Sequence, residues 1–408
     1  MEKTILKAYR FQLKPSREQK LLLEKHFGCV RFVYNYFLNQ RKEQYASTGK
    51  SEFYHAQAMA LTQLKKQNGF TWLKEVNSQC LQEALANLDI AYCSFFKGKT
   101  CFPRFKSKRN STNSFTVPQF FSVKRDKLCI PKFKAGIKLN LHQEIQGRIK
   151  RCTISKTASD KYFVSILCEQ QYEPFAPTGK SVGVDLGIKD FAVLSNGTKF
   201  KNHRFAKKYE RALKKAQQHL SRKVKGSYSF EKQRRKVARL HEKVSNSRKD
   251  VLHKVSHKLV KNFDIICLES LNIKGMIKNH KLAKHIADAS WGTFVQMLEY
   301  KALWNDKRIA KVGRFFPSSK TCNVCGYINQ NLNLSMREWD CPSCAKHLDR
   351  DINASINILK EGLRTLSKSA GTVDNTDGDS NKTSSSLWKK RHKSMKSEAH
   401  PIAYGVGG

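Results

Sequence analysis

The chain has 408 residues, with 77 Lys and Arg against 33 Asp and Glu, which gives a formal net charge of +44. This length allows two or three domains, and so large a positive excess predicts binding to a polyanion, most simply nucleic acid. The sequence contains no run of about 18 apolar residues and no apolar signal-peptide core. These patterns argue against a membrane-spanning or secreted protein and lead us to expect a cytoplasmic one.

The first half of the chain changes from strand to helix and back to strand. Residues 1–14 partly alternate and end at Pro15, which predicts a strand. Within 16–96 the apolar residues recur at helical spacing, which predicts a mostly helical region. A basic loop containing "FPRFKSKR" and then short alternating runs fill 97–180, which predicts a small antiparallel barrel or sandwich. The strand at 3–13 would complete that barrel, with the helices as an insertion.

The second half begins with a predicted hairpin over 181–200, which turns at Asn196–Gly197. Residues 201–262 are helical in pattern and carry 21 Lys and Arg against 4 Asp and Glu, with a break at 225–229. The run "FDIICLES" at 263–270 is continuously apolar, as expected for a buried parallel strand. Beyond Arg364 the composition becomes polar, which predicts a disordered tail over 365–408.

Four of the twelve cysteines form two C-x-x-C pairs separated by fifteen residues: Cys322, Cys325, Cys341 and Cys344. This spacing is typical of a structural zinc site, in which four thiolates leave no open position for water. Gly326 falls where the turn of a zinc knuckle needs a permissive backbone. We expect the other eight cysteines to be free and His347 to be a bystander.

Three acidic positions each lie where an apolar run meets a turn or a helix start. Asp185 lies in "SVGVDLG", Glu269 ends "DIICLE", and Asp349 and Asp351 open a helix in "HLDRDINASIN". Strand ends of a parallel sheet gather ligand-binding groups, and clustered carboxylates bind divalent cations that cut phosphodiesters. Taken singly, Asp349 or Asp351 is equally explained as a helix N-cap, and Glu269 as a partner for backbone groups.

Several of these segments, in this order, resemble the TnpB family of transposon-encoded proteins (OrfB of insertion sequences), compact relatives of the type V CRISPR effector nucleases. The resemblance covers about residues 3–365. It rests on "FPRFKSKR", "VGVDLGIKDFAVLSNG", "LESLNIKGM", "DASWGTFVQMLEYKA", "FPSSKTCNVCG" and "WDCPSCAKHLDRDINASINIL". One departure is "AKH" after Cys344, where the family usually has a glycine.

The resemblance implies an α+β multidomain protein whose RNase H-like (RuvC) nuclease domain is split in sequence and carries an inserted zinc ribbon. The catalytic, Mg²⁺-binding carboxylates would be Asp185, Glu269 and Asp351, with Asp349 as the preceding non-catalytic aspartate. A small β-barrel (wedge) domain would carry a helical (recognition) insertion. The implied boundaries are wedge 1–15 and 97–180, recognition 16–96, nuclease 181–315 and 349–364, zinc ribbon 316–348, and tail 365–408.

The implied activity is RNA-guided cleavage of double-stranded DNA in the prokaryotic cytosol or nucleoid. The guide RNA would derive from the transposon end, and the protein would read a short motif beside the target. Three other functions remain open: a non-cleaving RNA-guided regulator, a strand-transferring recombinase, and a zinc-ribbon DNA binder that needs no RNA. The oligomeric state is also open.

Candidate nucleic-acid contacts come from two segments. Tyr54, Ser78 and Gln82 lie at the starts of predicted helices, where they would read bases. The loop "FPRFKSKR" mixes Phe102 and Phe105 with four cations, and it would stack on RNA bases and contact phosphates. Its two phenylalanines are equally consistent with core positions. The four cations are Arg104, Lys106, Lys108 and Arg109.

Overall fold

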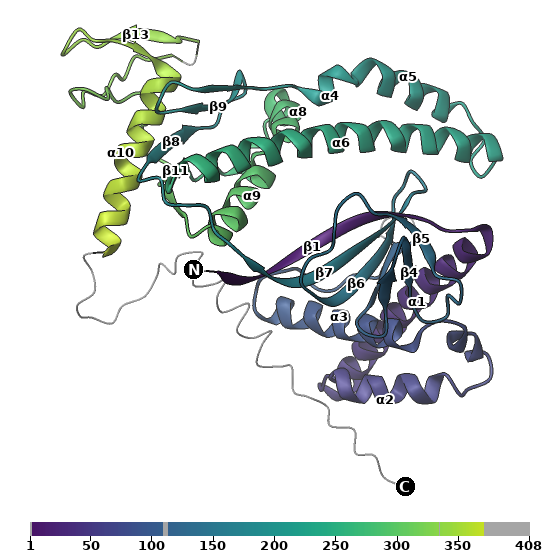
Figure 1. Ribbon diagram of the computed structural model, residues 1–408. Coiled ribbons are helices and arrows are strands. Elements are labelled where there is room, and N and C mark those ends of the chain that lie inside the picture. The colour runs from purple at the N-terminus through teal and green to yellow at the C-terminus, as the bar shows by residue number, and fades with distance from the viewer. Residues whose placement is uncertain (1, 109–112, 334, 371–408) are drawn as a thin grey trace.

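The chain forms two lobes, each built on its own β-sheet, and a small cysteine-bearing hairpin at one end (Figure 1). The computed structural model describes residues 2–108, 113–333 and 335–370. No helix within these ranges combines the length and apolar content needed to cross a bilayer.

The N-terminal lobe contains a seven-stranded antiparallel sheet in the order β2-β6-β7-β1-β5-β4-β3. The first strand, Lys3–Lys14, lies at its centre and pairs with both β5 and β7. No ladder joins the edge strands β2 and β3 in the part of the chain that the structure describes, so the expected closed barrel stays a prediction. The strands are β1 (Lys3–Lys14), β2 (Asn113–Val117), β3 (Ser122–Lys124), β4 (Lys127–Cys129), β5 (Ile137–Asn140), β6 (Arg148–Lys156) and β7 (Tyr162–Tyr172).

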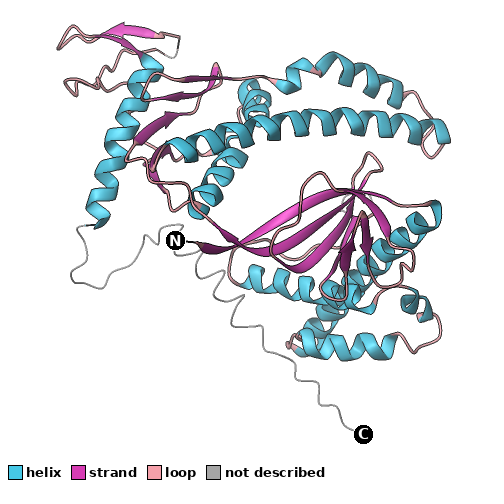
Figure 2. Ribbon diagram, viewed as in Figure 1, coloured by secondary structure: helices cyan, strands magenta, loops and turns pink. Residues whose placement is uncertain are grey.

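Helices between β1 and β2 cover one face of this sheet (Figure 2). The long helix α1 begins at a capping box, in which Ser16 and Gln19 each accept a hydrogen bond from the other's backbone N–H group. It ends at Gly49, which takes the left-handed conformation that favours glycine. The helices are α1 (Arg17–Thr48), α2 (Tyr54–Leu64), the 3₁₀ helix η1 (Thr71–Glu75) and α3 (Ser78–Phe96).

The second lobe contains a five-stranded mixed sheet in the order β10-β9-β8-β11-β12. The strands β8, β11 and β12 run parallel, while β9 and β10 extend the sheet as an antiparallel hairpin. The expected hairpin over 181–200 and the buried parallel strand within 263–270 are therefore confirmed. The strands are β8 (Ser181–Asp185), β9 (Asp190–Leu194), β10 (Lys199–Lys201), β11 (Ile265–Glu269) and β12 (Arg308–Val312).

Helices cover both faces of the mixed sheet, as a parallel arrangement requires. Val182, Val184, Ile266 and Leu268 face a core built largely by α6, α8 and α9. The opposite face packs against α10, and the expected break between two basic helices separates α5 from α6. The helices are α4 (Phe205–Lys208), α5 (Glu210–Ser221), α6 (Tyr228–Asn262), α7 (Ile273–Met276), α8 (His280–Ala289), α9 (Trp291–Trp304) and α10 (Arg350–Ala370).

Helix α10 approaches the sheet so closely that two glycines are required at the contact. A Cβ atom on Gly183 of β8 would overlap the carbonyl oxygen of Ser355 and lie 2.7 Å from the amide nitrogen of Leu359. A Cβ atom on Gly362 would lie 2.6 Å from Cβ of Cys267 in β11. Real Cβ atoms do not tolerate such distances, so these glycines set the spacing between helix and sheet.

The same helix corrects the expected start of the tail at residue 365, because α10 continues to Ala370. Leu366 packs against the core between α10 and the sheet. Thr365 and Ser367 donate their hydroxyl groups to backbone carbonyls of the preceding turn, which makes their polar side chains compatible with a helix. The rest of the expected tail, 371–408, lies outside the described residues.

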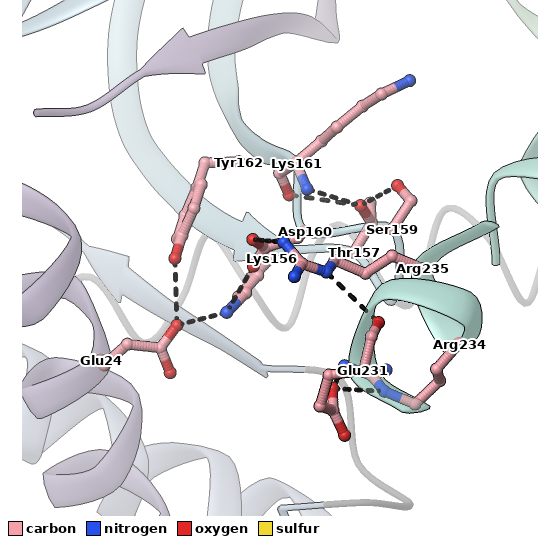
Figure 3. A network of polar contacts seen from close by, with 10 residues as sticks. All are labelled: Glu24, Lys156, Thr157, Ser159, Asp160, Lys161, Tyr162, Glu231, Arg234 and Arg235. Carbon is pink, nitrogen blue, oxygen red and sulfur yellow. Dashed lines mark hydrogen bonds and ion pairs between the residues drawn. The ribbon is translucent and has the colours of Figure 1, made fainter. Parts of the chain in front are cut away.

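The two lobes meet at two places. At the first, Tyr172 and the backbone N–H of Phe175 both donate hydrogen bonds to Asn305. At the second, the β6–β7 turn meets α6 (Figure 3): Asp160 lies 3.7 Å from Arg235, and Lys156 joins Asp160 to Glu24 of α1. Ser159 of the turn also donates to Glu242 of α6 at 2.7 Å. Half-exposed ion pairs contribute at most about 1 kcal/mol each, so this second contact consists of several small contributions.

The close contact at Gly183 predicts that Gly183→Ala destabilises the second lobe by about 3 kcal/mol, because the added methyl group overpacks the backbone of α10. Thermal unfolding followed by circular dichroism measures this loss. The control is Gly28→Ala in α1, where a Cβ atom meets nothing within 4 Å and helix propensity favours alanine. An unfolding temperature for Gly183→Ala equal to that of the wild type would show that α10 does not lie this close.

Candidate active site and cysteine cluster

Asp185 and Glu269 lie side by side at one edge of the mixed sheet. Asp185 is the last residue of β8, and Glu269 is the last residue of β11. The two strands are parallel, and their register pairs Val184 with Leu268, one residue before each acid. Since neighbouring strands lie about 4.8 Å apart, the two carboxyl groups start from adjacent backbone positions.

Asp351 joins them from the first turn of α10. Its approach to Asp185 is visible in the electrostatics. The pKa of Asp185 is raised from 3.8 to about 7, first by burial and then by the negative charges of Glu269 and Asp351. Arg350 and Arg337 oppose this rise. The three acids that the sequence marked over a span of 167 positions are thus electrostatic neighbours in the folded chain.

The structure shows which of Asp349 and Asp351 caps α10, a point that the residue pattern alone left open. Asp349 accepts hydrogen bonds from the backbone N–H groups of Asp351 (2.9 Å) and Ile352 (3.0 Å), so it caps α10. It also pairs with Lys199 at 2.6 Å. Burial alone would raise the pKa of Asp349, but the bonds from Lys199 and the backbone outweigh burial and lower it. Asp351 has a looser partner, Arg337, at 3.5 Å.

Polar residues that sequence reasoning missed hold this edge in place. Ser318 donates its hydroxyl group to Glu269. Asn353 and Asn357 of α10 are buried, and both donate to the carbonyl oxygen of Thr321, at 2.7 and 2.6 Å. Asn357 also donates to the carbonyl of Ser318 at 2.9 Å. The available signal was the spacing of the two asparagines, which at i and i+4 share one helix face.

The four cysteines converge beside this edge. Their sulfur atoms all lie within 4.8 Å of one another, with Cys322–Cys344 at 3.7 Å and Cys325–Cys341 at 3.5 Å. A tetrahedral zinc site with Zn–S bonds of about 2.3 Å separates its sulfurs by about 3.8 Å. The observed spacing therefore fits a tetrahedral cation site.

Two matching turns build the cluster. Gly326 donates its backbone N–H to the carbonyl of Cys322, and Ala345 does the same to Cys341. Both residues have a positive φ, 79° at Gly326 and 54° at Ala345. Ala345, where the resemblance leads us to expect a glycine, thus keeps the turn at some cost in strain. The hairpin β13 (Glu338–Asp340) and β14 (His347–Asp349) leads from the cluster into α10.

Thiol ionisation in the cluster is unequal. The backbone N–H of Tyr327 is the main group that lowers the pKa of Cys325, to about 6. The backbone N–H of Lys346 favours a thiolate at Cys344, but burial and the other three sulfurs raise its pKa to about 12. Four thiolates therefore need a cation to coexist. His347 faces Asp340 at 2.8 Å, as a bystander would.

Among the described residues, the four cysteines are the one set of three or more His, Cys, Asp or Glu side chains whose ligand atoms all lie within 4.8 Å. The three carboxylates are neighbours, but they are not drawn together this tightly.

The candidate nucleic-acid residues lie apart from the acids, in the N-terminal lobe. Tyr54 is half-buried against the core, whereas Ser78 and Gln82 are exposed one turn apart on α3. Arg104 and Lys108 are exposed. Lys106 instead lies over the ring of Tyr34, 3.8 Å from its centroid, and burial lowers its pKa. Arg109 lies outside the described residues.

Three models of known protein families match successive parts of the chain. The family model OrfB_IS605, described as "Probable transposase", matches residues 165–290. A "Cas12f1-like, TNB domain" model matches 291–358, and a "Helix-turn-helix domain" model matches 1–50.

Two curated relatives span nearly the whole chain. A "Putative RNA-guided DNA endonuclease" of Streptomyces pristinaespiralis is 36% identical over 366 residues, which cover 89% of this chain and 91% of the relative. The "Putative RNA-guided DNA endonuclease InsQ" of Escherichia coli K12 is 32% identical over 379 residues, covering 88% and 93%.

A solved structure shares the fold. The protein in the "Cryo-EM structure of the Cas12f1-sgRNA-target DNA complex" superposes with a TM-score of 0.50 at 13% identity, over 87% of this chain and 98% of that one. The α+β fold is therefore of the Cas12f1 type. With relatives above 30% identity along most of its length, this chain belongs to the TnpB (OrfB) family.

Proposed function

We propose that this protein is an RNA-guided DNA endonuclease that cleaves phosphodiester bonds at the edge formed by Asp185, Glu269 and Asp351. The observation that carries this proposal is the convergence of these acids from β8, β11 and α10. Burial first, and then the charges of Glu269 and Asp351, raise the pKa of Asp185 to about 7. The relatives named as endonucleases support the same activity.

The donor set at this edge suits Mg²⁺, because it consists of carboxylate oxygens beside a hydroxyl group. Bound there, Mg²⁺ would activate water and stabilise the leaving oxygen. Glu269 is oriented by Ser318, and Asp351 is fixed by the capped first turn of α10. Arg337 lies beside Asp351 and would attract the scissile phosphate.

We assign zinc to the four cysteines, where it would be structural because no ligand position remains for water. The mixed-sheet lobe would be the RuvC-like nuclease domain and residues 316–348 its zinc ribbon. The seven-stranded sheet and helices α1–α3 would be the wedge and recognition regions.

According to the family resemblance, the guide RNA would come from the transposon end. It would supply sequence specificity by base pairing, while the protein would contact the sugar-phosphate backbone and the shape of the RNA–DNA duplex. The basic helices α5 and α6 would line the path of the heteroduplex, because 201–262 carries 21 cations and 4 acids. Tyr54, Ser78 and Gln82 would read the motif beside the target.

The test is to purify the protein with co-expressed RNA from a transposon end and to add a plasmid library with randomised flanks. We expect linear product that disappears in EDTA and returns with Mg²⁺ but not with Zn²⁺ alone. Cutting by protein that lacks RNA would reject the guided mechanism. Binding without cutting would indicate a regulator, and joined products a recombinase.

Asp185→Asn should lower the cleavage rate by about a thousandfold or more, because a cation ligand worth several kcal/mol is lost. The amount of RNA that copurifies with the protein should stay unchanged. The matched control is Asp349→Asn, which removes a helix cap worth about 1 kcal/mol and should still cut. Equal loss of cutting in both variants would contradict the assignment of roles.

The raised pKa of Asp185 predicts a pH dependence of stability when no Mg²⁺ is present. Between pH 4 and 7 the folded protein holds a proton on Asp185 that the unfolded chain releases, so its stability falls as the pH rises through this window. Asp185→Asn cannot lose this proton. The unfolding midpoint of the wild type minus that of the variant should therefore decrease from pH 4 to 7 and then level off. A difference that is flat throughout would contradict the shift.

Cys341→Ser should remove bound zinc and lower the thermal stability of the hairpin and of α10, because the thiolate cage loses one of its four ligands. Elemental analysis of the purified protein measures zinc per chain. Cys101→Ser is the control, since that exposed cysteine lies outside the cluster. Unchanged zinc content in Cys341→Ser would overturn the zinc assignment.

A further inference from the structure

The loop "FPRFKSKR" and the end of α3 form an aromatic cluster on the N-terminal lobe that the proposed chemistry does not use. Three of its rings are exposed, Phe96 at 71%, Phe105 at 52% and Phe102 at 41%, and Phe96 and Phe102 share the same two aromatic neighbours. Beneath them lie Tyr92 and Phe95, with the Phe102 ring edge-on to both, at centroid distances of 5.6 and 5.3 Å. The exposed rings therefore stand on an aromatic base rather than filling a core.

Hydrogen bonds define the backbone between the two rings. Lys97, Gly98 and Lys99 all donate backbone N–H groups to carbonyls of the last turn of α3. Gly98 takes the left-handed conformation, with φ +65°, which turns the chain toward Phe102. Fixed aromatic rings lose little conformational freedom when a partner stacks on them.

The surroundings of the rings are basic. Residues 90–108 contain five Lys or Arg and no Asp or Glu. Lys97, Lys99 and Arg104 are exposed, and Lys42 of α1 lies over the ring of Phe105, 5.3 Å from its centroid. A second copy of this chain would bring the same positive rim against this one, whereas a nucleic acid brings phosphates.

We propose that Phe96 and Phe102 form a stacking platform for unpaired bases of the guide RNA, with the surrounding cations holding its phosphates. This inference rests on the proposed function. Aromatic rings bind the flat faces of bases, and those faces are accessible only where bases are unpaired. The target DNA enters as a duplex with its base faces stacked, and only the strand that guide pairing displaces exposes them later. A folded RNA exposes loop bases before any target is bound, so we commit to the RNA as the partner.

The test uses a single-stranded oligoribonucleotide carrying 2-aminopurine, and the same strand annealed to its complement, at salt high enough to suppress simple phosphate binding. Stacking contributes about 1–3 kcal/mol per base, so Phe96→Ala with Phe102→Ala should weaken binding of the single strand by about tenfold or more. Duplex binding should be unchanged, and Phe96→Trp should retain the affinity.

Phe120→Ala is the matched control, because that ring is 79% exposed but belongs to the turn before β3. Circular dichroism should show the wild-type fold for all variants, with only a small fall in unfolding temperature in the double variant from the lost ring contacts. Unchanged single-strand affinity in the double variant would overturn the platform, even if RNA-guided cutting persists. A wild-type protein that binds the single strand through these rings but does not cut DNA with its guide RNA would instead count against the proposed function.

Self-association is the competing explanation of the exposed rings. Light scattering of the RNA-free protein after size exclusion measures it directly. A wild-type dimer that the double variant converts to monomers, with RNA affinity unchanged, would overturn the proposal in favour of a protein interface.

Discussion

The contact between α10 and the mixed sheet is the constraint on which the rest of this lobe depends. Only glycine fits at 183 and 362, because any Cβ atom would collide with the facing backbone or with Cys267. The resulting close approach brings the first turn of α10, with Asp351, to the strand ends that carry Asp185 and Glu269. The side chains of Asn353 and Asn357, two and six residues after Asp351, bind the segment that leads into the first cysteine pair. The placement of α10 against the sheet thus determines where both the three acids and the cysteine hairpin lie.

Gathering three acids at one edge is costly in electrostatic energy, and the fold offsets this cost in two ways. Burial and repulsion leave a proton on Asp185 near neutral pH in the absence of a cation. Arg337 and Arg350, which flank the hairpin β13–β14, supply positive charge to the same edge. The hairpin therefore has a second role besides holding the four cysteines together, since it also positions the guanidinium group of Arg337 beside Asp351. This coupling gives a physical reason for a cysteine cluster to lie between the second and third acids in sequence.

Local patterns in the sequence predicted much of this fold, because each pattern reflects one element. The alternating and apolar runs predicted β1, β8, β9 and β11, and the cysteine spacing predicted the cluster. The pattern did not decide whether Asp349 or Asp351 caps α10, since both occupy cap-like positions. In the structure Asp349 accepts the backbone N–H groups of the first turn and also pairs with Lys199, which is 150 residues away in sequence. Composition misplaced the end of α10 because Thr365 and Ser367 satisfy their hydroxyl groups within the helix. Lys106 points toward the ring of Tyr34 and not into solvent. Tyr34 is 72 residues earlier in the sequence, so a local pattern cannot predict this contact.

The basic segment 201–262 carries far more positive charge than its own acids can neutralise. All four acids of 201–262 already have partners: Glu210 pairs with Lys284, Glu231 with Arg234, Glu242 with Lys161, and Asp250 with Lys254. Two of these partners lie outside the segment, so internal pairing leaves most of its 21 cations uncompensated. Screening at physiological salt acts over about 8 Å, which does not cancel repulsion between neighbouring turns of α6. The segment therefore keeps an excess of positive charge that only a polyanion can neutralise over its whole length. Few contacts to the other lobe offset this charge: Arg235 of α6 faces Asp160, while Glu242 of α6 pairs with Lys161 and accepts a hydrogen bond from Ser159.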